Sequence, residues 1–453
     1  MGRRTAWLIL AVLVAAFAAG LGIVVALRGA DCPVELSRVQ PSTPELVAAS
    51  DLAPEGSVGE ERQPVIDAVQ QLGGPFGDLV AGRFYSAGET VPVLVPFGDD
   101  VVMARSGADG GDFRAVDLPD GAVRWARAYD GGAARGGLVG NDFVVLVGGQ
   151  APTVVALGAE QGDQRSCVAV PVAGESGNVD TLLTDQAGSD VVVVAGPPAA
   201  PVTISRISPA DGTVRWQHRL DGLAEAGSVT VVGDSAVVSR LGQDPVRLAD
   251  MAAAGGIGAP MVTAYSLGDG SETWSYPAAE DAASTAALVV GSEPGTGTVV
   301  VMTSEPGGSR SSKATVARLV ALDSDGAEVW STSLGRGYWS ASLWGTTVVA
   351  QGAARSGGAE LRAFDVADGR LRWTLDSATL PSVGSEPRTN FGPATAVGAD
   401  YVVPAPNGLV VVDPDSGEVQ RLDSPVAIQQ VMTAGSHLLV ATQDALFVLE
   451  ADG

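Results

Sequence analysis

Short apolar runs rich in valine alternate along most of the chain with clusters of glycine, aspartate and serine. Asp190–Gly196 and Gly408–Pro414 are continuous β-branched runs of this kind, and other runs alternate apolar with polar positions. Short runs of this composition, bounded by turn residues, are typical of strands and not of a helix with its period of 3.6. The pattern therefore predicts an all-β domain from about Thr90 to the C-terminus.

One phrase recurs eight times within this pattern: the end of an apolar run, an Asp-Gly pair or a variant of it, and a second short run. The turn glycines are Gly121, Gly162, Gly212, Gly270, Gly326, Gly369, Gly417 and Gly453. Their mean spacing, (453 − 121)/7 or about 47 residues, falls within the roughly 40–50 residues expected for a four-stranded propeller blade. We therefore predict an eight-bladed β-propeller of four-stranded antiparallel blades, with seven blades as the alternative.

In five copies a tryptophan follows the turn glycine by four residues, and these are Trp125, Trp216, Trp274, Trp330 and Trp373. Asp-Gly is typical of a two-residue hairpin turn, because glycine adopts the positive φ that this turn requires. A side chain at a fixed distance from the turn points to a fixed face of the blade, where an aromatic ring covers a large apolar area. We predict that these tryptophans pack between blades and do not stack on a ligand.

The phrase A-x-D-x-x-D-G-x-x-x-W, complete at Ala115–Trp125 and Ala363–Trp373, resembles the repeat of the pyrroloquinoline-quinone-like, or quinoprotein-like, β-propeller family. The threonine usual before the glycine is Asp in the clean copies, Gln161 in the second copy and Ser416 in the seventh. The resemblance implies one of two classes: quinone-dependent dehydrogenases that use calcium, or non-catalytic envelope scaffolds that present the propeller to partner proteins. Fold alone does not choose between them.

Motifs for catalysis or metal binding are absent from the sequence, which has no His-Glu-x-x-His, no Gly-x-Ser-x-Gly and no phosphate-binding glycine loop. Asp323 and Asp325 superficially resemble a calcium loop, as do Asp413 and Asp415, but neither pair continues into the acidic ladder ending in Glu that such a loop needs.

The histidines and cysteines do not indicate a catalytic site. The two histidines, His218 and His437, fit surface or packing positions. The dehydrogenases that the repeat resembles have an adjacent Cys-Cys pair, whereas Cys32 and Cys167 are far apart. We predict no catalytic, cofactor or metal site and a membrane-anchored scaffold for an unidentified envelope protein or ligand. The alternative is a dehydrogenase dependent on pyrroloquinoline quinone and calcium.

Ala6–Leu27 is an uncharged apolar run of 27 − 5 = 22 residues. As a helix it would be about 33 Å long, enough to cross a hydrocarbon core of about 30 Å. Arg3 and Arg4 precede this run and a large acidic domain follows it, which favours a cytoplasmic N-terminus. We predict a cytoplasmic segment over residues 1–5, a single transmembrane helix over residues 6–27, and a C-terminal domain outside the cell membrane.

Two other N-terminal interpretations fit less well. A cleaved signal peptide has small residues available at Ala16–Gly20, but its apolar region is expected to be only about 10–15 residues long, and here it continues to Leu27. A lipoprotein is disfavoured because the charged Asp31 precedes Cys32.

The formal net charge of −25 excludes nucleic acid as a partner, because the acidic domain repels a polyanion. The single lysine, Lys313, among abundant Ala, Gly, Val and Arg is typical of a GC-rich bacterial genome. In the oxidising envelope, Cys32 and Cys167 form a candidate disulfide, and two unpaired thiols are the alternative.

Residues 28–75 read as a flexible stalk, because Gly29–Gly59 is rich in Pro, Ser, Ala and acids. A short helix is predicted near 64–72, with Pro64 at its first position and an apolar face for the propeller formed by Val65, Ile66, Val69 and Leu72. The propeller is assigned to residues 76–453.

The eighth repeat ends with the chain and lacks an outer strand. We predict that Asp78–Tyr85 supplies this strand and pairs with Ala445–Glu450, because an open ring exposes a strand edge. Polar insertions at Gln243–Pro260, Glu305–Lys313 and Ala378–Gly392 are expected to project from one rim.

Overall fold

The computed structural model describes residues 32–450, with gaps at 41–43, 54–56, 74–75, 87–88, 90, 107–109, 119, 131–133, 149–151, 173–180, 197–201, 221–225, 241–260, 277–285, 294, 307–314, 337–338, 354–358, 377–393, 406–407 and 425. The predicted transmembrane helix over residues 6–27 lies outside this part of the chain. Within it, no helix combines the length and apolar character needed to cross a membrane.

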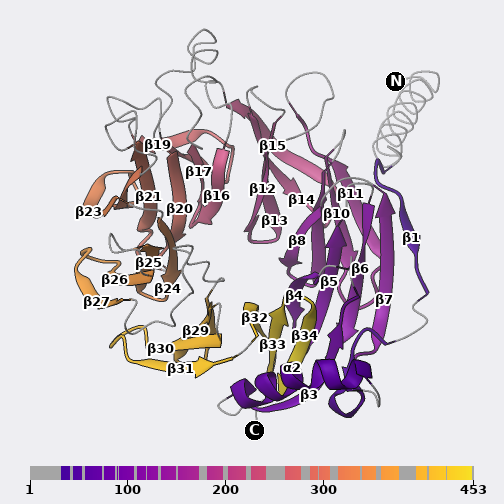
Figure 1. Ribbon diagram of the computed structural model, residues 1–453. Coiled ribbons are helices and arrows are strands. Elements are labelled where there is room, and N and C mark those ends of the chain that lie inside the picture. The colour runs from indigo at the N-terminus through magenta and orange to yellow at the C-terminus, as the bar shows by residue number, and fades with distance from the viewer. Residues whose placement is uncertain are drawn as a thin grey trace, which may run out of the picture.

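Eight antiparallel sheets follow one another around a ring, which confirms the predicted eight-bladed propeller (Figure 1). In each blade the strand that comes first in the order below is the innermost one. Blade 1 contains β4 (Val93–Phe97), β5 (Asp100–Ser106), β6 (Gly110–Asp117) and β7 (Val123–Asp130). Blade 2 contains β8 (Ala134–Val139), β9 (Asp142–Val147), β10 (Thr153–Gly158) and β11 (Gln164–Ala169). Blade 3 contains β12 (Thr181–Ala187), β13 (Asp190–Gly196), β14 (Val202–Ser208) and β15 (Thr213–Leu220). Blade 4 contains β16 (Ala226–Val232), β17 (Ser235–Arg240), β18 (Val262–Ser266) and β19 (Glu272–Tyr276).

The second half of the ring repeats this order. Blade 5 contains β20 (Ala286–Ser292), β21 (Val299–Pro306), β22 (Thr315–Leu322) and β23 (Glu328–Arg336). Blade 6 contains β24 (Trp339–Trp344), β25 (Thr347–Ala353), β26 (Ala359–Asp365) and β27 (Leu371–Leu375). Blade 7 contains β28 (Thr395–Val397), β29 (Asp400–Ala405), β30 (Gly408–Val412) and β31 (Val419–Asp423). Blade 8 contains β32 (Ile428–Ala434), β33 (His437–Thr442), β34 (Ala445–Glu450) and β3 (Asp78–Phe84).

The ring closes as the sequence predicts. β3 pairs antiparallel with β34, with Asp78 opposite Glu450 and Phe84 opposite Ala445. The first and last strands of the propeller thus lie side by side in one blade (Figure 1). This pairing removes the exposed edge that an open ring would leave on β34.

The segment predicted as a flexible stalk instead lies against the propeller over its described residues. β1 (Leu36–Arg38) adds a fifth strand to blade 1 beside β7, and β2 (Val47–Ala48) adds one to blade 8 beside β3. We call residues 32–84 the N-terminal strap. The prediction of a flexible stalk from its polar composition is wrong for these residues, because a few apolar anchors such as Leu46 and Leu52 are almost fully buried.

The helix of the strap is longer than predicted. A short 3-10 turn, η1 (Ala49–Asp51), precedes α2 (Ser57–Gly73), and Pro64 lies inside α2 and not at its first position. The predicted apolar face does pack on the propeller, because Ile66 and Val69 are buried against blade 8 residues such as Phe447. This packing compensates for the backbone hydrogen bond that proline cannot donate.

The turn chemistry differs from the prediction. Two-residue turns join the first and second strands of every blade except blade 5, and each begins with a glycine whose φ lies between 54° and 64°. The Asp-Gly turns join the third and fourth strands and are longer. In blade 1 the Gly121 N–H donates to the Asp117 carbonyl, and the Asp117 N–H donates to the Ala122 carbonyl. Glycine is therefore the last residue of a four-residue turn, at φ 68°.

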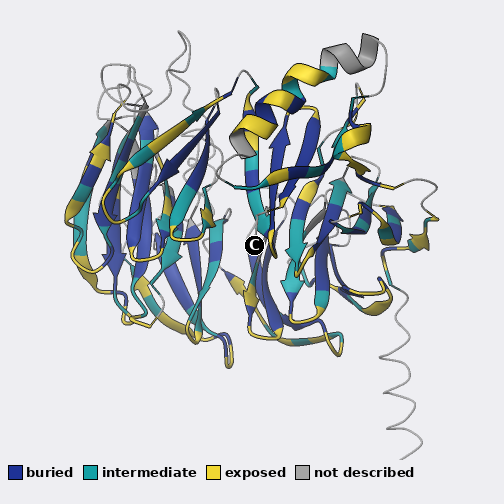
Figure 2. Ribbon diagram, turned by 90° about the horizontal axis from the view of Figure 1, so that it is seen from below, coloured by how far each residue is buried: buried dark blue, intermediate teal, exposed yellow. Residues whose placement is uncertain are grey.

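The core lies in the seams between neighbouring blades. Side chains from facing sheets form clusters such as the one joining Phe113 and Trp125 of blade 1 to Phe143 of blade 2. Buried residues run along the strands, while exposed residues concentrate at the turns and on the outer side of α2 (Figure 2). Because each blade buries its faces only against its neighbours, the seams decide the stability of the ring.

Candidate functional site

The predicted tryptophans lie in the seams and bind the next blade. The indole N–H of Trp125 donates to the Ala159 carbonyl at 2.7 Å, and that of Trp373 donates to the Pro414 carbonyl at 2.9 Å. Trp216 and Trp330 make the same bond to Leu267 and Val366. Each of these four acceptors lies three residues before the turn glycine of the following blade.

The same turn glycine lies directly on the tryptophan ring. A Cβ atom built on Gly162 would lie 2.4 Å from Trp125 Cδ2, and one built on Gly417 would lie 2.5 Å from Trp373 Cγ. Gly326 lies in the same way against Trp274. The repeat therefore links the glycine of one blade to the tryptophan of the blade before it. In the sequence the two residue types form one local motif, which does not reveal this contact between blades.

The turn carboxylates are occupied by turn and blade contacts. Asp120 Oδ1 accepts the Ala122 N–H at 2.9 Å, the usual role of aspartate in a turn. On the adjoining strands, Arg372 binds Asp365 at 2.7 Å, and its hydrogen bond lowers the pKa of the Asp365 carboxyl. Among the described residues, no group of three or more His, Cys, Asp or Glu side chains is placed to hold a metal ion.

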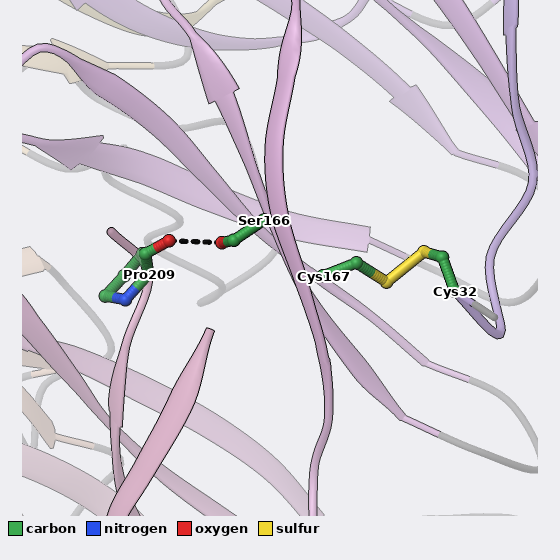
Figure 3. The surroundings of a disulfide bond; sticks show 4 residues. All are labelled: Cys32, Ser166, Cys167 and Pro209. Carbon is green, nitrogen blue, oxygen red and sulfur yellow. Dashed lines mark hydrogen bonds between the residues drawn. A yellow bond between two sulfur atoms is a disulfide. The ribbon is translucent and has the colours of Figure 1, made fainter. Parts of the chain in front are cut away.

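The seam between blades 2 and 3 departs from the repeat. Ser166 occupies the tryptophan position, and its hydroxyl donates to the Pro209 carbonyl, which lies three residues before Gly212 (Figure 3). Among the described residues no ring covers Gly212 as Trp125 covers Gly162, because a Cβ atom on Gly212 would find its nearest neighbour, Val168 Cγ2, at 3.6 Å.

Cys167, next to Ser166, forms a disulfide with Cys32, with an S–S distance of 2.02 Å (Figure 3). The candidate pair from the sequence is therefore joined in this structure. Both cysteines pack at the seam between blades 1 and 2. The bond fixes the start of the described strap to the outer strand of blade 2.

A pocket of about 240 Å³ lies at the inner end of the seam between blades 2 and 3. It is lined by Gly136 and Gly137 of β8, by valine and leucine side chains, and by Asp185 and Gln186 of β12. Both carboxylate oxygens of Asp185 already accept backbone N–H groups, from Gln186 at 2.8 Å and Val231 at 2.6 Å. The pocket therefore suits a small apolar group and offers no free base or nucleophile.

A buried ion cluster lies where blades 8 and 1 meet. Glu45 of the strap is 1% exposed and accepts bonds from Arg83 at 3.0 Å, from Arg114 at 2.7 Å and from Arg105. Burial, and then the charge of Glu45, raises the pKa of Tyr85, beside these arginines, to about 12. Because Glu45 and two further carboxylates, those of Glu89 and Asp112, balance the charges of the three arginines, this cluster fastens the strap to the closing seam and leaves no open anion site.

The two histidines occupy packing positions. His218 is exposed, with its ring beside Trp216 and against Gly270. His437 is only 3% exposed and opens β33, opposite Glu450. Neither lines the pocket between β8 and β12 described above, which we call the β8–β12 pocket.

A quinone and calcium site does not fit the residues described around the ring axis. The innermost strands carry two ionisable residues, Arg135 of β8 and Asp185 of β12, and Asp185 is occupied by backbone N–H groups. Such a site needs several oxygen ligands and a base that converge from different blades. We therefore derive no reaction through this cofactor.

A family model described as outer membrane protein assembly factor BamB matches residues 109–292 and again residues 261–448. Together the matches run over 109–448, more than half of the 453 residues. They confirm the resemblance to the pyrroloquinoline-quinone-like repeat seen in the sequence. No curated protein sequence matches the chain.

Several solved structures have a fold similar to that of this chain. The chain is similar to the Dos1 propeller, with 11% identity, a TM-score of 0.54, and coverage of 82% of this chain and 94% of that one. It is similar to a quinohemoprotein alcohol dehydrogenase from Comamonas testosteroni, with 11% identity, a TM-score of 0.54, and coverage of 82% and 76%. It is also similar to Sqt1 from Saccharomyces cerevisiae, with 12% identity, a TM-score of 0.51, and coverage of 82% and 98%. At these identities the likeness shows the fold alone.

Proposed function

Because the chain belongs to the pyrroloquinoline-quinone-like repeat family whose model is described as outer membrane protein assembly factor BamB, we propose that it is a non-catalytic binding scaffold. In this proposal the propeller is anchored in the cell membrane by residues 6–27 and lies on the extracytoplasmic side. It holds an envelope protein or a ligand without turnover.

The observation that carries this proposal is the difference between the two rims of the ring. Within a four-stranded meander, the connections between strands one and two and between strands three and four lie at one end of the blade. We call this end of the ring the turn rim, and it consists almost entirely of short glycine turns. The opposite loop rim receives the long connections, including residues 241–261 between β17 and β18 and 376–394 between β27 and β28. Binding residues concentrate on variable loops held by a rigid scaffold.

The chemistry of the described interior favours binding over reaction. The β8–β12 pocket is mainly apolar, and its carboxylate is already hydrogen-bonded. Val93, the first residue of β4, lies on the loop rim and is 60% exposed, so it is accessible to anything bound there.

Site-specific photo-crosslinking tests the use of the loop rim. A photoreactive amino acid at Val93 of the full-length protein in its native envelope is expected to give an adduct of defined mass. Leu371 is the matched control, because it is apolar, 51% exposed and on the turn rim. Adducts that form only from Leu371, or equally from both positions, contradict binding through the loop rim.

Membrane anchoring is tested separately. The full-length protein is expected to remain in the membrane fraction after a high-salt wash, whereas a variant lacking residues 6–27 is expected to be released. N-terminal sequencing of the mature protein distinguishes the uncleaved anchor from a cleaved signal peptide.

The absence of turnover is tested with the purified protein, calcium and pyrroloquinoline quinone. We expect no reduction of an artificial electron acceptor with a panel of alcohols and sugars. Substrate-dependent reduction would refute the scaffold and support the alternative dehydrogenase.

A further inference from the structure

Two arginines lie directly opposite each other on the outer wall of blade 1. Arg38 of β1 is the cross-strand partner of Arg127 of β7. Residues opposite each other in an antiparallel pair have Cβ atoms about 4.5–5.5 Å apart, and like charges in this arrangement repel each other. The pairing is therefore unfavourable unless an anion lies between the two guanidinium groups.

Neither arginine has a carboxylate partner within the described residues. Arg127 is only 8% exposed, and its Nη1 donates to the Ala126 carbonyl at 3.1 Å. Arg38 is exposed and forms no ion pair in the described part of the chain. Buried arginines are rarely left without an opposite charge, so Arg127 is the exceptional member of the pair.

Nearby acids do not replace the missing partner. Burial, and then the charge of Arg38, lowers the pKa of Arg127, and the opposing effect of the Asp163 charge is the smallest of the three. The carboxylate of Asp163 lies 3.8 Å from Arg165, which binds Asp142 at 2.8 Å. The acids at this seam are thus shared with Arg165.

The position of the pair points to a source of anions. Cys32 begins the described strap, is fixed to blade 2 by its disulfide, and lies six residues before Arg38. Leu27, the last residue of the predicted membrane span, is five residues before Cys32 and so lies at most about 17 Å from it. Arg38 is 38 − 27 = 11 residues after Leu27, a reach of at most about 36–40 Å, so this part of the wall can lie at the headgroup layer if the anchor of the proposed function is correct.

We propose that Arg38 and Arg127 form a binding site for a phosphate group, supplied by the headgroup of an anionic phospholipid. Paired guanidinium groups bind phosphate oxygens through charge-assisted hydrogen bonds. The net charge of −25 does not prevent this binding, because charges more than about 8 Å away are largely screened at physiological ionic strength. The binding of a phosphate group is inferred from the arginine pair. The assignment of this phosphate to a lipid headgroup rests on the proposed membrane anchor.

The experiment uses the full-length protein in two arms. In detergent, inorganic phosphate is titrated and the melting temperature is measured. In nanodiscs, the melting temperature in phosphatidylcholine is compared with that in a mixture with phosphatidylglycerol. The variants are Arg38→Gln and Arg127→Gln, with Arg165→Gln as the matched control because that arginine is nearby and already ion-paired.

We expect Arg38→Gln to weaken phosphate binding about tenfold, the effect of losing one hydrogen bond to a charged group, and to abolish the stabilisation by phosphatidylglycerol. Arg165→Gln is expected to retain both effects. Arg38 is exposed, so its variant remains informative if Arg127→Gln fails to fold.

The two arms separate the possible failures. Phosphate binding that depends on Arg38 without any effect of phosphatidylglycerol keeps the anion site, assigns it to soluble phosphate and refutes the lipid source. Unchanged phosphate and lipid responses in Arg38→Gln refute the site itself, whether or not the protein is membrane-anchored.

Discussion

The seam between blades 6 and 7 and the seam between blades 2 and 3 contain the same repeat position with different residues. At the first seam Trp373 binds the Pro414 carbonyl and lies against Gly417. At the second, Ser166 binds the equivalent carbonyl of Pro209 but leaves Gly212 uncovered by a ring. The polar bond between blades is therefore kept in both seams, while the aromatic area is lost in one.

The weaker seam adjoins two other features, the pocket at its inner end and the disulfide at its outer strand. A covalent bond to the strap at Cys167 lies one residue from the position where the aromatic contact is missing. The ring therefore has two means of stabilisation, repeated packing between blades and a single covalent tie to the strap.

The largest effect is expected at the covalent tie. The disulfide links positions separated by 135 residues, and the chain-entropy model gives about 4–5 kcal/mol for a loop of this length. Cys167→Ser should lower the free energy of unfolding by up to this amount, measured by denaturant titration. Cys32→Ser should give the same loss, and the double variant no more. Losses that add in the double variant would contradict a single shared bond.

The second-largest effect is expected at the seam between blades 6 and 7. Trp373 is 9% exposed, so Trp373→Ala should lower the free energy of unfolding by about 3–5 kcal/mol, as large aromatic truncations in cores do. Its counterpart Ser166→Ala removes only a hydrogen bond and should cost about 1 kcal/mol. Equal losses of unfolding free energy for the two variants would contradict the expected difference between the two seams.

The turn glycines give the smallest and most specific contrast. Gly417 and Gly212 both have positive φ, at 72° and 68°, so an alanine strains the backbone equally at each. A Cβ atom meets the Trp373 ring at 2.5 Å in one case and only an ordinary contact at 3.6 Å in the other. Gly417→Ala should therefore be more destabilising than Gly212→Ala by about 1–3 kcal/mol, the usual effect of overpacking. A smaller loss of unfolding free energy for Gly417→Ala than for Gly212→Ala would show that the Trp373 indole does not restrict the turn.

Much of the fold could be predicted from the sequence, because each copy of the repeat has the same turn and packing residues at the same spacing. The spacing of the turn glycines predicted eight blades, and the missing strand of the last blade predicted that β3 closes the ring. The tryptophan position was also predictable, since an aromatic at a fixed distance from a turn has one face to occupy.

Other features depend on contacts that local patterns do not contain. The strap has the composition of a linker, and only the burial of Glu45 and Leu46 in the closing seam shows that it is part of the propeller. The Arg38–Arg127 pair arises from strand register between segments far apart in the chain. The degenerate copy of the repeat at Gly162 is visible in the sequence, but the bond from Ser166 to Pro209 depends on the position of the next blade.

The closure of the ring also sets an order of events during synthesis. β3 is made early, but the partner of its first residue, Glu450, follows 450 − 78 = 372 residues later. At about 5–20 residues per second this interval is roughly 20–75 s. During that time β3 has no β34 to pair with, and the apolar face of α2 has no blade 8 to cover it. The edge of β3 and the apolar face of α2 therefore obtain their native partners only once blade 8 has been synthesised.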